Sequence, residues 1–86
     1  MLLDKIRRTQ AEIQFLRDVD GFARDGETIR EIAARYQMSG SNFPYYLAKF
    51  GFKLDLRRNR LVDTLRSTPF RDMETRGEFE ITEGQP

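Results

Sequence analysis

The sequence predicts a mostly α-helical protein: a small helical bundle with a long N-terminal helix, a pair of short helices in the middle and a flexible acidic tail. Apolar residues recur at helical spacing over residues 2–23 and 28–50. At 86 residues, 38% of them hydrophobic and 34% charged, the chain has material for one lean core. The last 20 residues are polar and acidic. We therefore expect a helical domain over residues 1–66 and a flexible tail over residues 67–86.

The composition restricts the classes of function. The chain has no cysteine and no histidine, so disulfides, thiolate metal sites and the commonest general base are excluded. Without a phosphate loop, a nucleophile motif or a metal cluster, we expect no enzymatic activity, no cofactor and no metal. No apolar run approaches a membrane span, and no signal peptide is visible, so we expect a cytoplasmic protein, associated with the nucleoid if it binds DNA. The net charge of +1 divides into a basic body and an acidic tail, which suits a polyanionic partner.

The first segment is predicted to be one amphipathic helix over residues 2–23, with a possible break at residues 7–10. The helix either packs on its own domain or forms a two-stranded coiled coil in a homodimer. The expected dimer contacts are Leu2, Ile6, Ile13 and Leu16. Gly26 can close this helix in a left-handed conformation.

Residues 28–50 predict two short helices joined by a tight turn, the helix-turn-helix arrangement. Thr28 and Glu31 fit a capping box that begins the first helix. Apolar residues from Phe43 onward give the second helix a buried face. Pro44 is tolerated only near the start of a helix, so the second helix is expected to begin at Asn42.

Residues 31–47 resemble the helix-turn-helix of bacterial and phage regulators. The matching residues are Ala33 where the helices cross, Met38-Ser39 at the turn, Phe43 four residues later, and Tyr46-Leu47 at the end. The chain departs from the pattern at Gln37, where the family commonly has Gly, and at Pro44. The resemblance implies a small transcriptional regulator that binds specific DNA sequences.

Residues 51–66 predict a short strand or an extended connector, followed by a third helix. Phe52 and Leu54 alternate with polar residues, and Asp55 can cap a helix over residues 56–66. Three arginines near its start oppose the helix dipole, so a phosphate contact would explain them. In the tail, residues 78–82 can form a short strand.

These features predict a protein that binds double-stranded DNA as a homodimer. Small polar residues near the start of the second helix suit the major groove, and basic residues suit the DNA backbone. The expected DNA-binding residues are Arg35, Ser39, Ser41, Asn42, Tyr45, Lys49, Arg57, Arg58 and Arg60. The alternative is a helical adaptor or inhibitor that docks on a protein partner through aromatic residues at positions 43–52.

Overall fold

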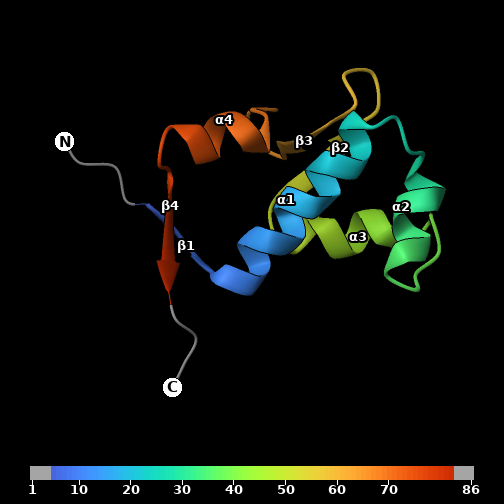
Figure 1. Cartoon of the computed structure of the whole chain (residues 1–86), viewed down its shortest axis with the longest axis horizontal. Coiled ribbons are helices and arrows are strands. Elements are labelled where there is room, and N and C mark those ends of the chain that lie inside the picture. Colours follow the sequence, from blue (N-terminus) through green and yellow to red (C-terminus); the bar gives the residue numbers. More distant parts are fainter. Residues whose placement is uncertain (1–4, 83–86) are drawn as a thin grey trace.

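The computed structural model describes residues 5–82, which form a mixed α/β fold of four helices and two small sheets (Figure 1). The expectation of a mostly α-helical bundle is therefore wrong. Strands β1 and β4 pair in parallel, and β2 and β3 form an antiparallel hairpin. Helix α1 lies centrally, with α2 and α3 at one end of the molecule and the β1–β4 sheet at the other.

The predicted N-terminal helix begins later than expected because a strand precedes it. Residues Ile6–Thr9 form β1, and α1 covers Gln10–Arg24. Thr9 begins the helix with a capping box to Glu12, in which each side chain accepts the other residue's amide. β1 pairs with β4 (Phe79–Thr82), a partner about 70 positions away that helical spacing cannot reveal. Leu2 lies outside the described residues.

Two short helices joined by a turn follow α1 as the sequence predicts. Gly26 ends α1 with φ 88°, which confirms its left-handed conformation. The capping box at Thr28 is also confirmed, and α2 covers Ile29–Arg35. Gln37 then takes φ 60°, and the next amide, of Met38, donates to the Ala33 carbonyl at 3.0 Å. Gln37 therefore adopts the left-handed conformation for which the regulators that residues 31–47 resemble commonly have glycine.

The second helix of the pair, α3, covers Phe43–Ala48 with Asn42 at its N-cap. The preceding turn is already helical, since the Phe43 amide donates to the Ser39 carbonyl at 3.0 Å. The Ser39 hydroxyl accepts from the Asn42 amide at 3.2 Å, so Ser39 caps this turn. Pro44 has no amide to donate to Gly40. The helix start therefore lies within one residue of the prediction.

The predicted helix over residues 56–66 is wrong: this segment belongs to a β-hairpin. β2 (Phe52–Asp55) pairs with β3 (Arg60–Asp63), and Leu54 lies opposite Leu61 on the buried side. Asn59 closes the connecting turn with φ 52°. Asp55 does cap backbone amides as predicted, but in this turn rather than in a helix. Pairing between strands therefore overrides the local capping signal.

Within residues 67–82, the part of the expected flexible tail that the structure describes, the chain instead packs into the core. Helix α4 covers Phe70–Thr75, and both Phe70 and Met73 are 1% exposed. The predicted short strand at residues 78–82 is confirmed as β4. Phe79 packs with Phe52 and Phe70, so the last segment closes one end of the core. These apolar residues are the exceptions in an otherwise polar and acidic segment, and their burial is what orders it.

The core is built around one face of α1. Ile13 is 2% exposed and Leu16 is fully buried, so two of the residues expected at a dimer seam lie inside this chain's own core. Ile6 is half-buried in β1. A coiled coil through this face would require the core to open. Within residues 5–82, no helix has the length and apolarity needed to cross a membrane.

Candidate nucleic-acid interface

Helix α3 presents a short polar face to solvent. Phe43 and Leu47 are buried and hold the helix against the core. On the other side, Tyr45 is 76% exposed, although large aromatic side chains are usually buried. Asn42 and Lys49 are exposed before and after it, at the two ends of the helix. The expected contacts Ser41, Asn42, Tyr45 and Lys49 are therefore all accessible.

Most of the remaining aromatic residues are buried or half-buried around α1. Phe15 packs against four rings: Tyr36, Phe43, Tyr46 and Phe50, with centroid distances of 5.0 to 6.4 Å. Phe52 is buried against Phe70. Of the aromatic surface that a protein partner was expected to use, Tyr45 alone is largely exposed. These rings position α3 instead.

The hairpin tip, residues 56–59, carries two arginines in different environments. Arg58 is hydrogen-bonded within the protein, whereas Arg57 is exposed and has no ion pair within the described residues. The Asp55 carboxylate accepts from the backbone amides of Arg57 and Arg58 and from the Arg58 guanidinium at 2.7 Å. The Arg58 hydrogen bond lowers the pKa of Asp55 below its ordinary value. Arg58 also donates to the Ser67 carbonyl at 2.9 Å, so it braces the hairpin. Arg57 forms no ion pair with any residue in the range 5–82.

Positive charge gathers along α3 and the hairpin. Residues 39–62 contain five Lys or Arg and a single Asp, which gives a net charge of +4. Of these five, only Arg58 is ion-paired within the described part of the chain. We call the other four the unpaired cations: Lys49, Lys53, Arg57 and Arg60.

Lys53 was missed by the sequence reasoning. It lies on β2 beside Phe52, with its side chain exposed while Phe52 is buried. The alternation of Phe52, Lys53 and Leu54 was the available signal, because successive residues of a strand point to opposite faces. The alternation was interpreted as a short strand or an extended connector, and the strand is the alternative that the structure confirms.

Arg35, by contrast, is engaged within the protein. Its guanidinium donates two hydrogen bonds to the Glu27 carboxylate, at 2.9 and 2.6 Å, and lies over the Phe22 ring at 4.0 Å. The hydrogen bond to Arg35 lowers the pKa of Glu27, and the same contact raises the pKa of Arg35. Arg35 therefore fastens α2 to the end of α1. Ser39 is similarly used as a cap.

The α2–α3 pair and the hairpin tip project from the same end of the molecule, away from the β1–β4 sheet (Figure 1). That end offers side chains of two kinds: hydrogen-bonding groups on α3, and cations without ion pairs beyond it. Such a combination can contact base edges and phosphates. Searches against protein-family models, curated proteins and solved structures found no match to this chain, so its functional interpretation rests on its own residues and geometry.

Proposed function

We propose that this protein binds double-stranded DNA, with α3 in the major groove and the hairpin along the sugar-phosphate backbone. One observation carries the proposal: the exposed polar face of α3 is followed at once by a hairpin whose cations lack ion pairs within residues 5–82. A cation already paired in the protein must break that pair to bind a phosphate. An unpaired cation contributes its full counterion release.

The side chains of α3 suit different parts of the duplex. An Asn side chain can pair with an adenine edge through its amide, which is the role we assign to Asn42. Tyr45 is placed to contact a sugar or donate to a phosphate. Lys49 and the hairpin cations would hold the backbone. Phosphate contacts position the protein, while Asn42 and Ser41 would carry sequence preference.

The reading surface is small, so the proposal includes a second copy of the chain. With six residues, α3 is about 9 Å long at 1.5 Å per residue and can contact only a few base pairs. Two copies related by two-fold symmetry would double the contacts and require a palindromic site. The dimer contact must use a surface other than the buried face of α1.

Selection from a random duplex pool tests this proposal. We expect enrichment of a palindromic sequence whose half-sites each span a few base pairs. The selected duplex should then bind Asn42→Ala and Tyr45→Ala at least tenfold more weakly than the unaltered protein. Both side chains are exposed, so neither change should lower stability appreciably.

Lys5→Gln and Arg76→Gln are suitable controls because both change exposed cations away from α3. Lys5 immediately precedes β1, and Arg76 immediately follows α4. Each should bind the selected duplex within about twofold of the original affinity. No enrichment from the pool, or full binding by the double variant Asn42→Ala/Tyr45→Ala, would exclude α3 as the reading helix.

A further inference from the structure

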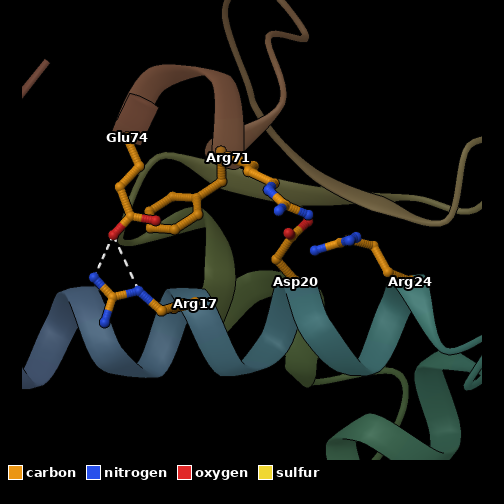
Figure 2. A pocket seen from close by; sticks show the side chains of 6 residues that line it. Arg17, Asp20, Arg24, Arg71 and Glu74 are labelled. Carbon is orange, nitrogen blue, oxygen red and sulfur yellow. Dashed lines mark hydrogen bonds and ion pairs between the residues drawn. The ribbon is translucent and has the colours of Figure 1, made fainter. Parts of the chain in front are cut away.

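A cleft between α1 and α4 contains three arginines and lies away from α3. Its volume is about 310 Å³, and Figure 2 shows the side chains that line it. The lining residues are Arg17, Asp20, Arg24, Phe70, Arg71 and Glu74. At 3.6 residues per turn, Arg17 and Arg24 lie on the opposite side of α1 from Phe15, whose ring contacts α3. The cleft is thus separate from the proposed DNA interface.

One arginine of the cleft is neutralised. The Arg17 guanidinium donates to the Glu74 carboxylate with two of its nitrogens, and this ion pair joins α1 to α4. The hydrogen bond to Glu74 raises the pKa of Arg17. Arg17 and Glu74 therefore form one wall of fixed geometry.

The other two arginines lie near one carboxylate without pairing with it. Arg71 from α4 and Arg24 from α1 both extend toward Asp20 (Figure 2). Asp20 is 4% exposed, and its carboxylate accepts the Leu61 amide of β3 at 2.9 Å. Neither Arg24 nor Arg71 makes an ion pair within 4.0 Å inside residues 5–82. Three guanidinium groups face two carboxylates, so the cleft has a net charge of +1.

We propose that the Arg24–Arg71 cleft binds a phosphate group. Guanidinium forks donate paired hydrogen bonds to phosphate oxygens, and a phosphate has enough oxygens to accept from two arginines at once. The Asp20 carboxylate, held by the Leu61 amide, lies at the floor of the cleft, and both guanidinium groups extend toward it from the open side, where a phosphate can approach (Figure 2). Phe70, buried beneath, adds an apolar floor.

The phosphate can belong to a small molecule or to a nucleic-acid backbone, and these sources are distinguishable. Because the cleft lies on the far side of α1 from α3, a duplex on α3 does not occupy it. We commit to the phosphate group itself, and use inorganic phosphate and pyrophosphate as probes. These titrations need no DNA, so they succeed or fail independently of the proposed function.

The test is a titration of the isotopically labelled full chain, followed by NMR at constant ionic strength. Phosphate and pyrophosphate should cause saturable shifts of the Arg24 and Arg71 side-chain signals and of the Leu61 amide, with none at Tyr45. Arg24→Gln/Arg71→Gln should weaken binding at least tenfold. The matched control Arg7→Gln/Arg76→Gln removes the same charge elsewhere and should bind as the original does.

The outcomes of the experiment distinguish a small phosphate compound from the phosphates of a nucleic-acid backbone. If the Arg24→Gln/Arg71→Gln variant binds duplex DNA unchanged but loses pyrophosphate, the ligand is a small phosphate compound. If its affinity for duplex DNA falls at least tenfold while the control's does not, the phosphate belongs to the backbone. The proposal is overturned if neither probe nor DNA binding depends on these arginines. If the variant folds poorly, the chemical-shift changes in the unaltered protein still test the proposal, because they show directly whether phosphate binds beside Arg24 and Arg71.

Discussion

The salt dependence of DNA binding provides the sharpest test of the proposed interface. Four unpaired cations lie on α3 and the hairpin, and each can neutralise one phosphate. At about 0.9 per phosphate, the logarithm of the affinity of one subunit for a half-site duplex should fall with the logarithm of salt concentration with a slope of about −3.6. Raising salt from about 50 to about 200 mM should then weaken binding by about 150-fold.

Replacing two of these cations should halve that slope. Arg57→Gln/Arg60→Gln leaves Lys49 and Lys53, so the slope should become about −1.8, and the same rise in salt should weaken binding by only about 12-fold. Arg58 is left unaltered because it braces the hairpin through Asp55 and Ser67. Any effect of the double variant therefore reports lost phosphate contacts rather than a disordered hairpin.

Fluorescence anisotropy with a labelled duplex that holds one half-site, measured over a series of salt concentrations, provides the assay. The matched control is again Arg7→Gln/Arg76→Gln, whose arginines make only long, exposed ion pairs at 3.8 and 3.5 Å. The control should keep a slope near that of the unaltered protein. Equal slopes in all three proteins would refute the reasoning, because they would show that binding depends on net charge or on another surface.

Three further predictions concern stability, each measured by urea unfolding. Gln37→Gly should be more stable than Gln37→Ala by about 1 kcal/mol, since only glycine takes φ 60° without strain; equal stabilities would contradict this. Asp20→Ala should lower stability by about 1–3 kcal/mol because the buried Leu61 amide loses its acceptor, and Asp20→Asn should lose less. Because the pKa of Glu27 is lowered, its ion pair with Arg35 stabilises the fold at neutral pH, and this stabilisation is lost as the pH falls through that pKa. The Glu27→Gln variant should lack this loss of stability at acid pH. If the stability of both proteins depends on pH in the same way, the ion pair does not contribute.

Local signals in the sequence predicted the elements that depend on neighbouring residues. The capping box at Thr28, the left-handed Gly26 and the start of the second helix next to Asn42 all follow from contacts within a few positions. The polar face of α3 follows from the same spacing. These features describe the part of the candidate interface that lies on one helix.

Contacts between distant segments were beyond such signals. Asp55 has the same capping capacity in a helix and in a turn, and only the pairing of Leu54 with Leu61 selects the hairpin. Without that pairing, the arginines at the tip could not be separated into Arg58, which braces the hairpin, and Arg57, which has no ion pair within residues 5–82. Arg35 was likewise assigned to DNA because its pair with Glu27, eight positions earlier, is a tertiary contact.

The sequence by itself determined the two short helices of residues 28–50, the basic character of residues 39–62 and the lack of histidine and cysteine chemistry. The tertiary structure alone decided that β1 pairs with β4, that Phe70 and Met73 belong to the core, and that three arginines meet between α1 and α4. The physical reason is the sequence separation over which each interaction acts. Caps and helical spacing act over about four residues, whereas strand pairing and core burial depend on which distant segments exclude water together.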